Sequence, residues 1–260
     1  MPATDLDLLT TAALRSGGIA KSYFGQSPQV WDKADNAGPV TAADLAVNDM
    51  LTSTLQSARP DYGWLSEETE DGTARLQTTR QFVVDPIDGT RAFIEGGKDW
   101  GHSLAVVENG AVTAAAVYIP MRDMLFAATL GGGATCNGQP ITTSDTALLG
   151  DASVLSHKAN FDGKYWKGGC APNMRKAFRS SLAYRLCLVA SGRFDAMLTF
   201  RPTWEWDIAA GSLIVAEARG IATTQTGSSL RFNNAHPQVT GVVAAGQLHG
   251  DIIACLHGNA

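Results

Sequence analysis

The chain has 260 residues, of which 45% are hydrophobic, and a formal net charge of −5. This size supports a large buried core, whereas a nucleic-acid-binding surface would show a basic face, so we expect no nucleic-acid polymer as partner. The four cysteines stand far apart, which favours neither a zinc site nor a disulfide framework. The sequence shows no export signal and no membrane span, and we therefore expect a cytoplasmic protein.

Two amphipathic helices are predicted in the first 58 residues. Apolar residues at helical spacing over positions 5–24 follow Thr4 or Asp5 as the cap. A second helix is predicted from Thr41 to Ala58, and its opening resembles a capping box in which Asp44 replaces the usual glutamate. On this reading Asp44 is simply an acid in the first turn, where the helix dipole favours it.

Four acidic residues follow two short predicted strands. The first strand, 62–66, ends at Glu67 and Glu68, which precede a polar loop. The second, 82–84, is expected to end at Asp85 because proline follows it. Asp85 and Asp88 then converge in a tight turn. Carboxylate and carbonyl oxygens select hard cations such as Mg²⁺, Mn²⁺ or Ca²⁺, although a capped turn with two solvated acids stays open.

The remainder of the chain predicts a sheet and then alternating strands and helices. A short helix at 91–95 precedes strands at 103–107, 112–118 and 124–129, and the glycines at 131–133 end the first half. From residue 152 onward, strands and helices alternate, which is typical of helices packed on a layered sheet. Asp207 opens the helix 207–219 either as its N-cap or as a metal ligand. The basic segment 157–179 is either a solvated surface or a site for a second phosphate.

The stretch Asp85–Thr90, which reads DPIDGT, resembles the central motif of the inositol monophosphatase family of Mg²⁺-dependent, lithium-sensitive phosphomonoesterases. Three further stretches, 39–44, 64–68 and 206–211, agree with the family in the same order. The resemblance covers about residues 30 to 220. It implies an α/β (α+β) fold, a layered αβαβα sandwich shared with the fructose-1,6-bisphosphatase-like sugar phosphatases. It also implies two or three Mg²⁺ ions and inhibition by Li⁺.

The resemblance also assigns roles to individual residues. It implies an N-terminal part, 1–140, with most metal ligands, and a C-terminal part, 141–260, with Asp207 and the substrate contacts. Thr90 and Asp44 would activate the attacking water, Glu68 would position it, and the N–H groups of Gly89 and Thr90 would hold the phosphate. The implied metal ligands are the carboxylates of Glu67, Asp85, Asp88 and Asp207 and the backbone carbonyl of Ile87.

Substrate recognition departs from the inositol phosphatases within this resemblance. Phe200 stands where those enzymes place a hydroxyl-binding glutamate, and Ser180-Ser181 replaces their Gly-Thr pair. The sequence here is more similar to the bacterial 3'(2'),5'-bisphosphate nucleotidases, which remove the 3'-phosphate of adenosine 3',5'-bisphosphate, a by-product of sulfate assimilation. We therefore expect substrate contacts from Ser181, Phe200 and Trp204, with the two aromatic rings as an apolar wall for a purine. Basic residues between 158 and 179, or Arg185 and Arg201, would bind the 5'-phosphate.

Other functions stay open at this point. Inositol-1-phosphate or histidinol phosphate are alternative substrates, and a small phosphate monoester is the expected partner in each case. A phosphatase with a nucleophilic aspartate is disfavoured because two residues, not one, separate Asp85 from Asp88. A non-enzymatic role, as an interaction protein linked to RNA polymerase or ribosomal RNA, is a further alternative. A homodimer is a possible oligomeric state.

Overall fold

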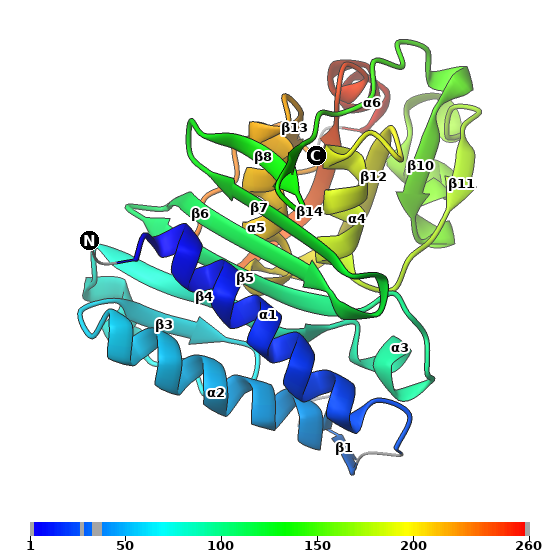
Figure 1. Cartoon of the computed structure of the whole chain (residues 1–260). Coiled ribbons are helices and arrows are strands. Elements are labelled where there is room, and N and C mark those ends of the chain that lie inside the picture. Colours follow the sequence, from blue (N-terminus) through cyan, green and yellow to red (C-terminus); the bar gives the residue numbers. More distant parts are fainter. Residues whose placement is uncertain (1–2, 27–28, 33–37, 258–260) are drawn as a thin grey trace.

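The computed structural model describes residues 3–26, 29–32 and 38–257. Two large β-sheets and three groups of helices alternate in five layers (Figure 1). The order of the layers is α1 and α2, a seven-stranded sheet, α4 and α5, a five-stranded sheet, and α6. This arrangement confirms the predicted αβαβα sandwich. The division of the chain at residue 140 stays a prediction.

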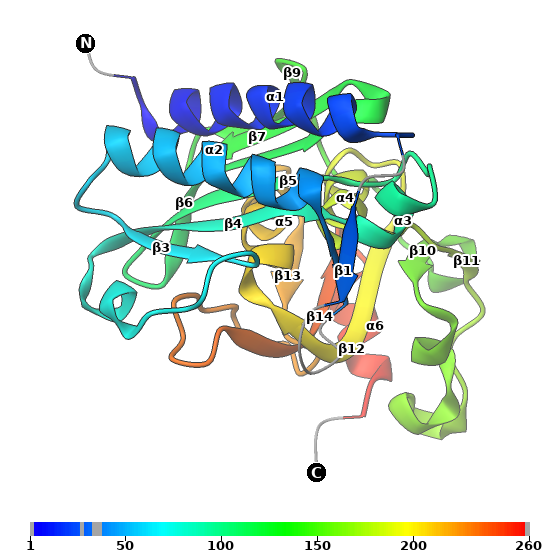
Figure 2. The same cartoon turned by 90° about the horizontal axis from the view of Figure 1, so that it is seen from below.

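Helices α1 (Asp5–Tyr23) and α2 (Ala42–Ala58) cover the outer face of the seven-stranded sheet, as Figure 2 shows. Each begins with a capping box, Thr4 with Asp7 and Thr41 with Asp44, in which the threonine oxygen accepts an N–H and the aspartate accepts the N–H of the cap residue. The two helices bury their apolar faces against strands β4 to β6 in one continuous cluster. Both predicted helices are confirmed.

The seven-stranded sheet has the order β3-β4-β5-β6-β7-β8-β9, and all neighbours are antiparallel except β3 and β4. The predicted strands between residues 62 and 129 are present, but the sheet continues past the glycines at 131–133 through two further strands. The bounds are β3 Gly63–Ser66, β4 Arg80–Asp88, β5 Gly101–Glu108, β6 Ala111–Ile119, β7 Met124–Thr129, β8 Gly133–Cys136 and β9 Gln139–Pro140.

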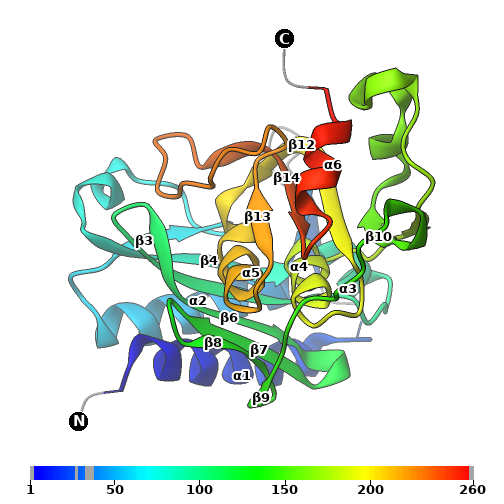
Figure 3. The ribbon, with the colours of Figure 1, turned by 90° about the horizontal axis from the view of Figure 1, so that it is seen from above.

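The five-stranded sheet has the order β11-β10-β12-β14-β13, and β10 is parallel to both of its neighbours. Figure 3 shows α4 and α5 beneath this sheet and α6 on its other side. The strands are β10 Ser153–Ser156, β11 Arg175–Ala177, β12 Ala196–Trp204, β13 Ile221–Thr223 and β14 Gln238–Ala245, and the helices are α4 Leu182–Ala190, α5 Glu205–Glu217 and α6 His249–Cys255.

Three short elements complete the fold beside the ends of β4 and β12. Strands β1 (Val30–Asp32) and β2 (Pro39–Thr41) form an antiparallel pair that leads into α2. Helix α3 (Thr90–Ile94) follows β4 directly and confirms the short helix predicted after the central motif. In the part of the chain that the structure describes, no helix is long and apolar enough to cross a membrane.

Two predicted boundaries at the acidic residues are wrong. Strand β4 does not end at Asp85 but continues to Asp88, and its register with β5 is irregular between these two residues. Such a bulge accommodates Pro86, which has no N–H to donate to the hydrogen bonds between β4 and β5. Helix α5 begins at Glu205 with Trp204 as its N-cap, so Asp207 lies in the first turn and is not the cap.

Candidate active site

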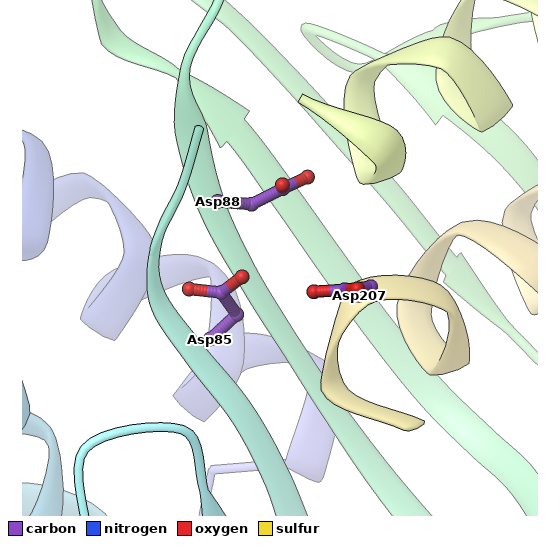
Figure 4. Close-up of side chains that lie close together, drawn as sticks. All are labelled: Asp85, Asp88 and Asp207. Atoms are coloured by element: carbon purple, nitrogen blue, oxygen red, sulfur yellow. The ribbon is translucent and has the colours of Figure 1, made fainter. Parts of the chain in front are cut away.

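Three carboxylates from distant parts of the chain meet between the two sheets. Asp85 and Asp88 come from the end of β4, and Asp207 comes from the first turn of α5. One oxygen of each lies within 4.8 Å of the corresponding oxygens of the other two. Figure 4 shows the three side chains converging on one space. The structure therefore brings together three of the four predicted carboxylate ligands of a cation.

Close packing of α4 against α5 helps to place this cluster. A Cβ atom at Gly211 would lie 2.6 Å from Cβ and Cδ1 of Leu186, so only glycine allows α5 to approach α4 at this distance. Helix α4 carries Ser181 at its N-cap, and α5 carries Asp207 in its first turn. The two helices thus present their N-terminal ends to the end of β4 side by side.

The electrostatics of the cluster favour a bound cation. Burial is the main cause that raises the pKa of Asp85, followed by the negative charges of Glu67, Asp88 and Asp207. Burial and the charges of Asp88 and Glu67 likewise raise the pKa of Asp207. The Oδ1 atom of Asp85 is buried and has no hydrogen-bond partner among the described residues. A buried acceptor of this kind is costly unless a cation or a proton compensates it.

Asp88 is held by α4. The hydroxyl of Ser181 and the backbone N–H of Ala183 each donate to Oδ2 of Asp88 at 2.6 Å. The side chain of Ser181 is fully buried, and its oxygen also accepts the N–H of Tyr184. The hydroxyl of Ser181 is thus used to cap α4 and to orient Asp88, and the contact of Ser181 with the substrate stays a prediction. A serine immediately before an apolar helical run is an N-cap signal that predicts the first of these roles.

Thr90 and Asp44 form the predicted hydroxyl–carboxylate contact. The hydroxyl of Thr90 lies 3.3 Å from Oδ1 of Asp44 and 3.1 Å from the carbonyl oxygen of Ile87. The other oxygen of Asp44 accepts the N–H and the hydroxyl of Thr41, at 2.9 and 2.6 Å. Asp44 is buried, so its orientation is fixed from the α2 side. The catalytic roles of the pair and the ligand role of the Ile87 carbonyl stay predictions.

The turn after β4 depends on one glycine and one histidine. Gly89 has φ +101°, and a Cβ atom there would lie 3.1 Å from the carbonyl oxygen of Asp99, so both its conformation and its surroundings require glycine. The fully buried His102 places Nδ1 2.5 Å from the carbonyl oxygen of Pro86. Our sequence reasoning missed His102, because a lone histidine just before the predicted strand 103–107 carries no signal of this contact.

Glu67 and Glu68 follow β3 at the rim of the cluster. The charge of Glu67 raises the pKa values of Asp85 and Asp207, which places its carboxylate beside both of them. The N–H of Glu68 donates to the hydroxyl of Ser66 at 3.3 Å, and both glutamates are half-buried. Their predicted roles, as a metal ligand and as a water-positioning acid, stay predictions.

The predicted aromatic wall of Phe200 and Trp204 does not form. Phe200 is buried against Tyr165 and Trp166, in the cluster on the α6 side of the five-stranded sheet. Trp204 is half-buried and stacks on Trp206 at 4.7 Å, and it belongs to the cluster on the opposite side. Side chains alternate between the two faces of a strand, and an irregular register between Thr199 and Pro202 intervenes, so the two rings lie on different faces of β12.

The chemistry of the donors fits divalent metal ions. The three side chains of the cluster offer carboxylate oxygens, which suit Mg²⁺, Mn²⁺ or Ca²⁺ better than zinc or copper. The buried Oδ1 of Asp85 is an acceptor that no group among the described residues uses, so it is free to bind a cation. The four cysteines are free thiols and take no part in this cluster.

Comparisons with known proteins agree with this geometry. A model of the inositol monophosphatase family matches residues 3–259. The chain is 32% identical over 235 residues to Nus factor SuhB of Escherichia coli, covering 85% of each chain. It is 32% identical over 225 residues to inositol monophosphatase 2 of Saccharomyces cerevisiae, covering 79% of this chain and 76% of that protein.

The fold shows the same relationship. An inositol monophosphatase of Thermotoga maritima superposes with a TM-score of 0.82 at 29% identity, covering 96% of this chain and 95% of that one. A layered α/β sandwich with an acidic cluster at the end of a strand defines a class of metal-dependent phosphatases. This chain belongs to the inositol monophosphatase family.

Proposed function

We propose that this protein is a Mg²⁺-dependent phosphomonoesterase, and that adenosine 3',5'-bisphosphate is its preferred substrate. The observation that carries the first part is the convergence of Asp85, Asp88 and Asp207 next to the Thr90–Asp44 contact. Phosphate monoesters hydrolyse extremely slowly without a catalyst, and a carboxylate-bound pair of cations is an established way to accelerate the reaction.

The residues of the chain divide the chemical tasks among them. Glu67, Asp85, Asp88, Asp207 and the Ile87 carbonyl would hold the cations. Bound cations would polarise the phosphate and lower the pKa of a water in the site. The hydroxyl of Thr90 would orient that water, with Asp44 accepting the hydrogen bond from the threonine. The N–H groups of Gly89 and Thr90, at the first turn of α3, would hold phosphate oxygens, because such N–H groups lack partners within the helix.

The preference for a nucleotide over a polyol rests first on Phe200. This residue stands seven positions before Asp207, and its ring is buried against Tyr165. Because the Phe200 ring lies in the core on the α6 side, position 200 supplies no hydrogen-bond acceptor for a polyol hydroxyl, and the loss of such a partner costs more discrimination than the loss of a methylene. The half-exposed Trp204 stays available for contact with an aromatic base.

A basic pocket beside the cluster supports a second phosphate. It has a volume of about 290 Å³ and lies at the carboxyl ends of the parallel strands β10 and β11, a usual place for ligands in open α/β sheets. Phe178 lines it three residues before Ser181, so their Cα atoms are at most about 11 Å apart. The guanidinium of Arg185 lies 4.5 Å from the Phe178 ring centroid. The pocket is lined by Ser156, Lys158, Phe161, Lys176, Ala177 and Phe178.

Inositol-1-phosphate is the second candidate substrate. Its support is the family itself and the names of relatives, such as the inositol-1-monophosphatase of Rhizobium meliloti, which is 31% identical over 257 residues. The name Nus factor SuhB describes the E. coli relative and not this chain. A protein without phosphatase activity on any ester would favour the non-enzymatic alternative.

A substrate panel tests the proposal. Phosphate release would be measured with Mg²⁺ or with EDTA from adenosine 3',5'-bisphosphate, adenosine 3'-monophosphate, inositol-1-phosphate and histidinol phosphate. We expect kcat/KM for the bisphosphate to exceed that for inositol-1-phosphate by at least about 10²-fold, which corresponds to a few kcal/mol of transition-state discrimination. Equal or faster hydrolysis of inositol-1-phosphate would contradict the nucleotide assignment. Activity that survives EDTA would contradict the metal chemistry.

Two lysine variants test the pocket. Lys158→Met combined with Lys176→Met should raise KM for the bisphosphate about tenfold or more and leave adenosine 3'-monophosphate unaffected, because only the former has a second phosphate to lose. Lys164→Met is the matched control, since Lys164 lies in the same segment but does not line the pocket. Equal effects on the two nucleotides would remove the pocket from substrate binding.

A further inference from the structure

A second acidic residue lies at the start of α5, and it is not part of the metal cluster. Glu205 is fully buried, two residues before Asp207. Its Oε2 accepts the N–H of Asn233 at 2.7 Å, and its Oε1 accepts the backbone and side-chain N–H groups of Asn234 at 2.9 and 2.7 Å. Both oxygens are thus used by the loop between β13 and β14, and the Glu205 carboxylate faces this loop.

An arginine from the connection between β3 and β4 holds the same two asparagines. Arg75 donates to Oδ1 of Asn233 at 2.6 Å and to the carbonyl oxygen of Asn234 at 3.0 Å. Two further bonds, at 2.6 and 2.7 Å, join its guanidinium to both oxygens of Asp71. The Arg75 side chain is only 2% exposed. A bidentate arginine with four hydrogen bonds has a fixed orientation, unlike a surface lysine.

These contacts connect the two halves of the proposed metal site. Arg75 lies in a 3-10 turn, Thr73–Gln77, in the connection between β3 and β4. Glu67 begins this connection, and β4, which ends it, carries Asp85 and Asp88. Figures 2 and 3 both show the β13–β14 loop, in orange to brown, beside this cyan connection.

We propose that Arg75 and Glu205 are positioning residues that fix the N-terminal turn of α5 relative to β4, and thereby the separation of Asp207 from Asp85 and Asp88. The Asn233-Asn234 pair is the link, because one side of it is bonded to the β3–β4 connection and the other to the first residue of α5. Groups that hold metal ligands in place often affect metal affinity nearly as strongly as the ligands themselves. The inference rests on the metal site of the proposed function.

The two possible roles of Arg75 and Glu205, stabilising the fold or positioning Asp207, predict different metal affinities. If Arg75 and Glu205 only stabilise the fold, their loss lowers the free energy of unfolding but leaves the folded protein with its full affinity for metal. If they position Asp207, the folded variants bind metal more weakly. Direct measurement of Mn²⁺ affinity, without substrate and below the melting temperature, separates the two possibilities.

The experiment is calorimetric titration with Mn²⁺ of the wild type, Arg75→Met and Asn233→Gly, with thermal unfolding of each as a fold check. Asn233 has φ +63°, so glycine keeps its backbone conformation and its N–H bond to Glu205, and only the side-chain bonds between Asn233 and Arg75 are removed, while the bond from Arg75 to the Asn234 carbonyl oxygen stays. We expect each variant to raise the Mn²⁺ dissociation constant about tenfold. Arg80→Met is the control. Arg80 begins β4, but its guanidinium pairs with Glu108 at 3.0 Å and does not bind the two asparagines.

The coupling between the two sides is tested by a double variant. Glu205→Gln together with Arg75→Met should bind Mn²⁺ little more weakly than either single variant, because both act through the same asparagines. Unchanged affinity in folded Arg75→Met and Asn233→Gly overturns the inference and leaves the proposed function standing, and Asn233→Gly decides alone if Arg75→Met does not fold. A wild type that binds no Mn²⁺ overturns the proposed metal site and this inference with it.

Discussion

At the scale of single residues, the buried acids could hold a metal ion, but their burial lowers the stability of the fold without one. Asp85 lies in the interior with an unpartnered oxygen and with three other carboxylates around it. Burying a charge without compensation is unfavourable, so without a cation Asp85, Asp88 and Asp207 hold protons more tightly than ordinary carboxylates do. A bound cation reverses this preference, because it stabilises the ionised forms. We therefore expect these three acids to destabilise the protein without metal and to stabilise it with metal.

The Thr90–Asp44 contact should act as a unit in catalysis. We expect Thr90→Ala and Asp44→Asn each to lower kcat by about 10²–10⁴-fold, the usual contribution of a proton-handling group, and the double variant to be little worse than either. Steady-state kinetics with saturating Mg²⁺ measures this. Asp7→Asn is the control, since Asp7 forms the same capping box on α1 away from the site. Losses that multiply would show that Thr90 and Asp44 act independently.

His102 should make stability depend on pH. Burial lowers the pKa of His102 from 6.5 to about 4. Between these pH values the unfolded chain binds more protons than the folded one, so the free energy of unfolding falls as the pH drops from 6.5 to about 4, by at most about 3 kcal/mol. His102→Asn keeps an N–H for the Pro86 carbonyl but does not titrate. Urea unfolding across this range should show a smaller decrease for the variant, and parallel curves would contradict the assignment.

At the scale of elements, close approaches decide the geometry more than helix propensity does. Helix α1 packs on β6 through Gly17, where a Cβ atom would lie 2.4 Å from the ring of Tyr118. Helix α5 is buried on nearly all sides between the two sheets, so it lacks the polar face of a surface helix. These contacts set the distances between the layers and hence the position of the helix ends at the site.

Two adjacent glycines of α1 should respond oppositely to the same substitution. Gly17→Ala should destabilise the protein by about 1–3 kcal/mol, because the new methyl group would overlap Tyr118. Gly18→Ala should instead stabilise it by up to about 1 kcal/mol, since no atom lies within 4 Å of the new Cβ and alanine favours the helix. Urea unfolding of both variants measures the difference. The same sign of change in both would contradict the predicted packing.

At the scale of the whole molecule, metal binding should be visible as global stability. Mg²⁺ at about 100 times its dissociation constant should add about 2.7 kcal/mol to the free energy of unfolding, because the unfolded chain does not assemble the cluster. Asp207→Asn should abolish this gain. Without metal, the same variant should be at least as stable as the wild type, because Asp207 then repels Asp88 and Glu67.

Thermal unfolding with Mg²⁺ and with EDTA measures both effects. Asp251→Asn is the control, since Asp251 is an exposed acid in the first turn of α6. An equal Mg²⁺ shift in the wild type and in Asp207→Asn would show that the ion binds elsewhere. Whether the protein forms a homodimer stays a prediction that sedimentation of the same samples would test.

The sequence by itself predicted most of the elements and the three carboxylates that the structure brings together. Apolar spacing and capping residues located α1 and α2, because these signals act within one turn of the chain, and the ordered motifs around Asp44, Glu67, Asp85 and Asp207 identified the family. Tertiary structure alone decided which face each side chain uses. Because the register of β12 is irregular, the side chain of Phe200 lies in the core. Ser181, the N-cap residue of α4, donates its hydroxyl to Asp88. Asn233 and Asn234 link Arg75 to Glu205, although these residues are more than a hundred positions apart in the chain. Contacts of this kind depend on how layers pack, and no local sequence pattern encodes them.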